Sequence, residues 1–146
     1  MGSTFRRVSA GGGAKYFYPW GECASPLSII VVDDDLAIQR AIAEILVDEG
    51  YEVRCAADGV EALAVLGERG LRPKLIILDL WMPSMDGLEF RARQKSLDTF
   101  ANVPVLVITA ARFLPRELKN LGLTNVLRKP LQLDDLLAKT RELIVR

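Results

Sequence analysis

The sequence contains no histidine and only two cysteines, Cys23 and Cys55. Without histidine the chain cannot build a Ser-His or Cys-His catalytic pair, which excludes the enzymes that depend on one. Two cysteines are too few for a disulfide framework, and no cluster of cysteine and histidine suggests a zinc site. We therefore expect a protein of a reducing compartment, the cytoplasm.

Neither sign of charge is in excess, because 19 lysines and arginines balance 19 aspartates and glutamates. This balance argues against direct nucleic-acid binding through a basic surface. No apolar run approaches the ~20 residues that a membrane-spanning helix needs, so we expect no membrane insertion. Arg6 and Arg7 are not followed by the apolar segment of a secretory signal.

Residues 1–26 differ in composition from the rest of the chain. They contain three consecutive glycines at 11–13 and an aromatic-rich stretch at 16–20, without a clear period. Glycine makes such a stretch flexible, so we expect a flexible N-terminal extension. The alternative is that the aromatic side chains dock on the domain or on a partner, since they bury large apolar areas.

Residues 27–146 alternate between short apolar runs and stretches with helical periodicity. This pattern predicts one α/β domain, a doubly wound parallel sheet of five strands. Strands are expected at 28–32, 52–56, 74–79, 104–109 and 125–128, and helices at 36–49, 59–69, 87–96, 115–121 and 132–145. Asp58 is predicted to cap the second helix, with Glu61 completing a capping box. In the last helix, Leu133, Leu136, Leu137, Thr140 and Ile144 are predicted to face the core.

Four of the predicted strands run into polar residues of different kinds. The first leads into Asp33-Asp34-Asp35, the third ends in Asp79, the fourth ends in Thr109, and the fifth leads to Lys129. Since the carboxyl ends of parallel strands meet at one edge of a sheet, these side chains are expected to share a cleft. Carboxylates, a hydroxyl and an ammonium group together suit a magnesium ion and a phosphoryl group.

Each of these residues alone also has an ordinary structural explanation. Acidic residues such as Asp33-Asp34-Asp35 often begin a helix, where they complement its dipole. A single threonine after a strand is usually a cap, and a Lys-Pro pair is usually part of a loop. The occurrence of all four at strand ends favours the phosphoryl site, in which an aspartate can act as the nucleophile.

The motifs at these strand ends resemble those of the response-regulator receiver domains of two-component signalling. The similarity covers residues 27–146 and is carried by the stretches 31–35, 78–87, 108–110 and 128–130. It implies the flavodoxin-like receiver fold seen in chemotaxis receivers. It also implies that Asp79 accepts phosphate from a phosphohistidine on a sensor histidine kinase or phosphotransfer protein.

The resemblance assigns a role to each matching residue. Asp34 would bind Mg²⁺ or Mn²⁺ directly together with Asp79, Asp33 would act through water, and the backbone carbonyl of Trp81 would be a further ligand. Thr109 would turn toward the phosphoryl group and Lys129 would pair with it, with a cis bond between Lys129 and Pro130. Such a protein catalyses only its own phosphorylation and dephosphorylation and signals to a downstream protein. We expect a monomer or a weak dimer.

The chain also departs from the family pattern. The fifth strand of a receiver usually carries a tyrosine or phenylalanine where this chain has Val126. The stretch from Thr109 to Lys129 is shorter than usual. Because the fourth helix, fifth strand and fifth helix form the usual output face, the site is expected to be intact while its read-out differs.

Two alternatives remain open at this stage. The first is a receiver-like module that signals by protein contact without phosphorylation, as the altered output face would allow. The second is a hydrolase of the haloacid dehalogenase kind, because Asp33-Asp34-Asp35 resembles its Asp-x-Asp motif; however, Leu36 and Ala37 stand where a threonine or valine would follow. No output domain follows Arg146, which is compatible both with a stand-alone receiver and with a piece of a longer chain.

Overall fold

The computed structural model describes residues 6–10, 13–17, 28–112 and 114–145. Strands and helices alternate from Ser28 onward, as the sequence predicts. The strands are β1 (Arg6–Ala10), β2 (Gly13–Phe17), β3 (Ser28–Val32), β4 (Glu52–Ala56), β5 (Pro73–Asp79), β6 (Val105–Thr109) and β7 (Val126–Arg128). The helices are α1 (Leu36–Asp48), α2 (Gly59–Leu66), α3 (Gly87–Lys95), α4 (Glu117–Asn120) and α5 (Leu133–Val145).

The predicted sheet of five parallel strands is confirmed. The strands lie in the order β4-β3-β5-β6-β7, and each is parallel to its neighbours. Strands β3 and β6 are buried along their whole length, as expected for a sheet that helices cover on both faces. The order reverses direction between β3 and β5, and ligands of open α/β sheets bind at such a switch point.

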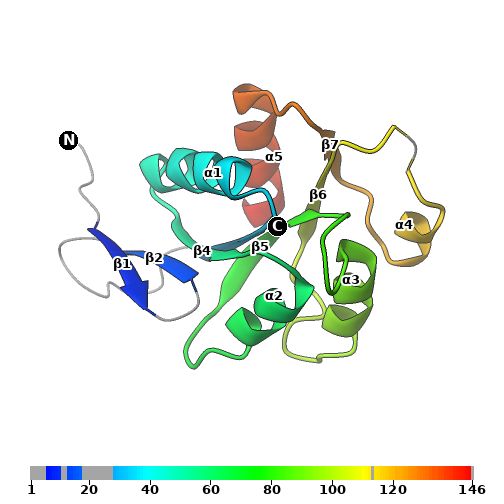
Figure 1. Ribbon diagram of the computed structural model, residues 1–146, viewed down its shortest axis with the longest axis horizontal. Coiled ribbons are helices and arrows are strands. Elements are labelled where there is room, and N and C mark those ends of the chain that lie inside the picture. The colour runs from blue at the N-terminus through cyan, green and yellow to red at the C-terminus, as the bar shows by residue number, and fades with distance from the viewer. Residues whose placement is uncertain (1–5, 11–12, 18–27, 113, 146) are drawn as a thin grey trace.

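Helices cover both faces of this sheet (Figure 1). One core lies under α1 and α5 and includes Ile42, Leu46 and Leu136. The other lies under α2, α3 and α4 and includes Leu66, Phe90 and Leu118. No helix in the described part of the chain is long and apolar enough to cross a membrane.

The hairpin of β1 and β2 was not predicted from the sequence. The two strands are antiparallel, with Arg6 opposite Phe17, and β2 pairs with the edge strand β4, where Lys15 lies opposite Arg54. The hairpin therefore extends the sheet to seven strands at its β4 edge. Part of the extension 1–26 therefore forms strands, and its flexibility stays a prediction; docking through Tyr18 or Trp20 concerns residues outside those described.

The ends of several helices differ from the predicted ones for local reasons. Helix α2 ends at Leu66, before two glycines, and Gly70 adopts a positive φ of 81°. Asp58 caps this helix as predicted, accepting a hydrogen bond from the Glu61 amide. The prediction that Leu133 faces the core is wrong. Leu133 is the first residue of α5, and its side chain is 49% exposed because the first turn of this helix faces solvent.

The loop between β5 and α3 is held closely against its neighbours. The Gly87 amide donates to the Leu80 carbonyl (2.8 Å), and the Gly59 amide at the start of α2 donates to the Met85 carbonyl (3.1 Å). A Cβ atom on Gly87 would lie 2.5 Å from the carbonyl oxygen of Asp79 and 2.9 Å from Cα of Leu80. Glycine at position 87 therefore allows α3 to begin directly against the end of β5.

We predict that Gly87→Ala destabilises the protein, because both atoms that its Cβ would meet belong to the backbone. Overpacking of this kind lowers the free energy of unfolding by about 1–3 kcal/mol, measurable by urea denaturation. Gly67→Ala is the control, because its Cβ would meet nothing closer than 3.4 Å. Equal stability of the two variants would contradict the steric argument.

Candidate functional site

The candidate site lies at the switch point of the sheet, where β3 and β5 are neighbours. Val32 pairs with Leu78, so the residues that follow or end these strands, Asp33 and Asp79, come out side by side. Both are almost fully buried, Asp33 at 0% and Asp79 at 5% exposed. Their proximity follows from the parallel register rather than from any contact between the loops.

The acidic triplet divides into two functions. Asp35 caps α1, accepting hydrogen bonds from the amides of Ala37 (3.0 Å) and Ile38 (3.3 Å). Asp33 accepts a bond from the Asp35 amide through Oδ1 (2.9 Å), which fixes its carboxylate. The helix-start interpretation therefore holds for Asp35, while Asp33 and the exposed Asp34 belong to the site.

Three carboxylates meet there. Oxygen atoms of Asp33, Asp34 and Asp79 all lie within 4.8 Å of one another. Within the described part of the chain, one cation faces them: Nζ of Lys129 lies 2.8 Å from Oδ2 of Asp33 and 3.5 Å from Oδ2 of Asp79. Since one ammonium group cannot balance three carboxylates, the site keeps an excess of negative charge that attracts a further cation.

The electrostatics of this group change the protonation of its members. Burial, together with the negative charge of Asp33, raises the pKa of Asp79 to about 6, although Lys129 and a hydrogen bond from the Trp81 backbone act in the opposite direction. Burial tends to lower the pKa of Lys129, but the hydrogen bond and charge of Asp33, assisted by Asp79, raise it above its usual value. Lys129 therefore stays charged, and Asp79 is ionised above about pH 6.

Thr109 ends strand β6, and Lys129 directly follows the neighbouring strand β7. The Lys129 amide donates to the Thr109 carbonyl (2.8 Å), which holds the ends of the two strands together. The Thr109 side chain is fully buried, and its Oγ1 accepts a hydrogen bond from the Ala111 amide (3.0 Å). The Lys129-Pro130 bond is cis, as predicted.

The donor set fits a divalent cation of the magnesium type. Oδ2 of Asp33 is buried and, apart from its ion pair with Lys129, accepts no hydrogen bond of normal geometry from the residues that the structure describes. Such an atom has a lone pair free for a cation or an ordered water. Oxygen ligands from one or two carboxylates, with water completing the octahedron, are what Mg²⁺ takes in proteins. Trp81 follows in the next loop and is 50% exposed.

The structure thus brings the side chains of Asp33, Asp34, Asp79 and Lys129 together, and it places Thr109 at the end of the neighbouring strand β6. It adds Gln39 of α1, which the sequence analysis missed: its Nε2 donates to the carbonyls of Asp33 (3.2 Å) and Ala56 (3.0 Å). Gln39 is 7% exposed. The only sequence signal was its position one helical turn after the cap and on the buried side of α1, where a polar residue needs a partner.

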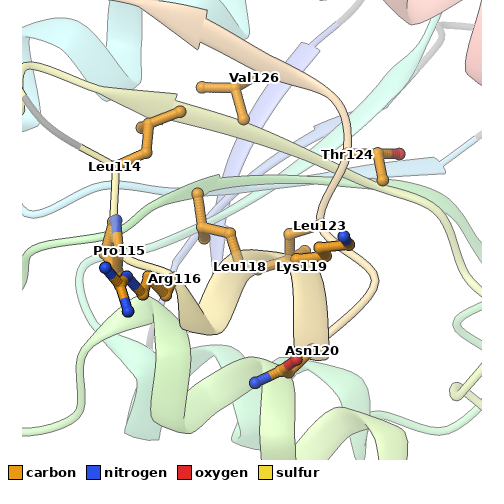
Figure 2. A pocket seen from close by; sticks show the side chains of 9 residues that line it. All are labelled: Leu114, Pro115, Arg116, Leu118, Lys119, Asn120, Leu123, Thr124 and Val126. Carbon is orange, nitrogen blue, oxygen red and sulfur yellow. The ribbon is translucent and has the colours of Figure 1, made fainter.

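Val126 of β7 lines a surface cavity. A surface cavity of about 590 Å³ separates α4 from β7, with apolar walls formed by Leu114, Leu118, Leu123 and Val126 (Figure 2). Arg116 and Lys119 also line it. Val126 itself is partly buried and packs against the core that contains Leu118 and Leu123.

Comparison with known proteins agrees with this geometry. The family model of the response regulator receiver domain matches residues 29–141. Response regulator MprA of Mycobacterium sp. (strain KMS) is 39% identical over 123 residues, covering 83% of this chain and 52% of that protein. MprA of Mycobacterium avium (strain 104) is 38% identical over 122 residues, covering 82% and 52%. The chain spans about half the length of these relatives.

Solved structures show the same fold over nearly their whole length. The chemotaxis response regulator CheY4 of Vibrio cholerae has a TM-score of 0.74 and 33% identity, covering 82% of this chain and 99% of that one. The receiver domain of NtrX from Brucella abortus has a TM-score of 0.71 and 30% identity, covering 80% and 98%. With its acidic cluster at the switch point of a flavodoxin-like sheet, the chain belongs to the response regulator receiver domains of two-component signalling.

Proposed function

We propose that this domain accepts a phosphoryl group on Asp79 in a His-to-Asp phosphorelay and signals by a change of conformation. The observation that supports this most directly is the arrangement around Asp79. Its carboxylate ends a buried strand, lies 3.5 Å from the Lys129 ammonium group and lies within 4.8 Å of two further carboxylates. A nucleophile so placed needs only a cation and an aligned donor, because phosphoryl transfer depends mainly on positioning and charge neutralisation.

In the proposed reaction a carboxylate oxygen of Asp79 attacks phosphorus. The bond from phosphorus to the imidazole nitrogen of the donor breaks, and the imidazole leaves with the electron pair. Lys129 pairs with the phosphoryl oxygens, and the Thr109 hydroxyl donates to one of them. A bound Mg²⁺ would neutralise charge on the phosphoryl oxygens.

Asp34 and Asp79 would hold the metal directly, and Asp33 through water. The Trp81 backbone carbonyl would add a ligand from the loop after β5. The exposure of Asp34 suits a direct ligand. Its carboxylate can exchange water for the ion, and when no ion is bound it does not remain as an uncompensated charge in the core.

The phosphoryl donor would be a sensor histidine kinase or a phosphotransfer protein, and the output a contact with a downstream protein. A module that works without phosphate is the weaker candidate. It has no use for three clustered carboxylates, which repel one another and cost stability. The chemical test below separates the two.

We predict that the wild-type protein, incubated with Mg²⁺ and acetyl phosphate, gains acid-labile phosphate, and that Asp79→Asn does not. The asparagine keeps the shape but lacks the attacking oxygen. Asp86→Asn is the matched control in the same loop, since asparagine can also cap α3 as Asp86 does. Intact-protein mass spectrometry measures the label. Full labelling of Asp79→Asn would show that another residue is the acceptor.

We predict that Asp34→Asn weakens Mg²⁺ or Mn²⁺ binding by at least about tenfold, because it removes a charged ligand. Isothermal titration calorimetry measures the affinity. Asp35→Ser is the control: serine retains the cap of α1 while removing a neighbouring charge. Equal losses in both variants would mean that Asp34 acts only through general charge.

The raised pKa of Asp79 has a consequence for stability without metal. The folded state holds the proton up to about pH 6, whereas a free aspartate loses it near 3.8. The contribution is therefore fully present below pH 3.8 and is lost as the pH rises through about 6. Above that pH, the ionised carboxylate destabilises the folded protein.

We predict that Asp79→Asn is more stable than wild type at pH 7.5 in EDTA, by up to about 3 kcal/mol. The difference should shrink as the pH falls through about 6 and vanish near pH 4. Urea denaturation at several pH values provides the measurement. Asp98→Asn, at an exposed site, should give no such gain. A constant difference across the whole pH range would contradict the assigned cause.

A further inference from the structure

The segment before and including α4 is held to the domain by few apolar contacts. Helix α4 has only four residues, of which Leu118 alone is buried. The cavity beside Val126 separates it from β7 (Figure 2). Polar contacts at the two ends of the segment therefore also help to fix its position.

Two arginines supply these contacts. Arg91 of α3 holds the far end, with Nε donating to the Leu121 carbonyl (3.0 Å), and is 8% exposed. Arg128, the last residue of β7, holds the near end: its Nη1 donates to the carbonyls of Ala111 (2.5 Å) and Arg112 (3.4 Å). Arg91 is buried, so water cannot readily replace the Leu121 carbonyl as its hydrogen-bond acceptor. Arg128 is exposed, so its bonds can exchange with water at little cost.

Ala111 connects Arg128 to the reaction site. Its amide donates to Oγ1 of Thr109 (3.0 Å), while its carbonyl accepts from Arg128. The peptide groups of Ala111 are thus held on one side by the hydroxyl proposed to contact the phosphoryl group and on the other by the arginine next to Lys129. A rotation of the Thr109 side chain would disturb its hydrogen bond with the Ala111 amide. Ala111 could move with Thr109 only if the hydrogen bond from Arg128 to the Ala111 carbonyl breaks.

We propose that Arg128 is a positioning residue that couples Thr109 to the segment 110–118. In the resting protein it fixes Ala111 and thereby the hydroxyl of Thr109. When Thr109 turns toward a phosphoryl group, Arg128 releases the loop, and the segment swings about the end that Arg91 retains. This coupling rests on the proposed phosphorylation of Asp79. It gives the domain a read-out that needs no aromatic residue at position 126.

The energetics allow such a release. A hydrogen bond from a charged donor to an exposed carbonyl shifts an equilibrium by only about five- to tenfold, because water competes for both groups. Both this contact and the proposed hydrogen bond from the Thr109 hydroxyl to a phosphoryl oxygen involve a charged group. They differ in exposure: the Arg128 contact lies at the surface, whereas the contact beside the buried Asp79 is less open to water and therefore outweighs it.

The test uses Arg128→Gln, Arg128→Lys and the control Arg116→Gln in the whole chain. Arg116 carries the same charge in the same segment, but its side chain makes no hydrogen bond with the described residues. Amide hydrogen exchange is measured in the resting protein and with Mg²⁺ and beryllofluoride, a phosphoryl mimic. Labelling by acetyl phosphate is measured in parallel.

In the resting state, Arg128→Gln should speed exchange over 110–118 by about five- to tenfold, leaving β3 and β5 unchanged. In Arg128→Gln, the phosphoryl mimic should then add little further exchange over 110–118. In wild type, the mimic should by itself produce most of the rise in exchange that Arg128→Gln shows at rest. Arg128→Lys should restore part of the protection, and Arg116→Gln should behave as wild type. These three results together support the coupling.

Two results would overturn the coupling alone while wild type is still labelled on Asp79. One is a mimic-induced change over 110–118 that is the same in Arg128→Gln and wild type. The other is a rise in exchange that spreads to β3 and β5 or appears equally in Arg116→Gln, which indicates a general structural role. Failure of wild type to take label would instead overturn the proposed function, and the coupling with it.

Discussion

The contact between Lys129 and Asp33 is the interaction on which the rest of the site depends. Asp33 is wholly buried, and a buried carboxylate is costly unless a cation and hydrogen bonds compensate it. Lys129 supplies the cation at 2.8 Å, and the Asp35 amide supplies a hydrogen bond to the other oxygen. Removal of the lysine would leave repelling carboxylates at the end of the central strands, so the ammonium group makes the acidic cluster compatible with a folded core.

The fold was largely predictable because it follows from local patterns. Apolar runs bounded by polar residues predict buried parallel strands, and the polar residue after each run predicts what meets at the sheet edge. Asp33, Asp79, Thr109 and Lys129 were found this way, since the register of parallel strands leaves their positions little freedom. The cap function of Asp58 was equally local.

What could not be predicted depends on contacts between segments distant in sequence. Gln39 gains its importance from the Ala56 carbonyl, seventeen residues away, and Arg128 from carbonyls of the loop after β6. The hairpin of β1 and β2 uses a stretch without clear alternation, and its strands pair with each other and, through β2, with β4. Leu133 fits the apolar stripe of α5, but periodicity alone does not show that this first residue of the helix is exposed.

The close fit of Gly87 against the Asp79 carbonyl makes the two walls of the site unequal. On the β5 side, the backbone of Gly87 lies directly against the backbone of Asp79. A Cβ atom added at Gly59 would lie 2.6 Å from the Met85 side chain, so neither glycine can be replaced by a larger residue without a shift of its neighbours. On the β6 side, Leu114 and Pro115 line an open surface cavity beside α4, so this wall is less closely packed. Larger residues at position 59 or 87 would therefore displace the backbone at the end of β5 that carries the nucleophile, whereas the β6 side has room for other side chains.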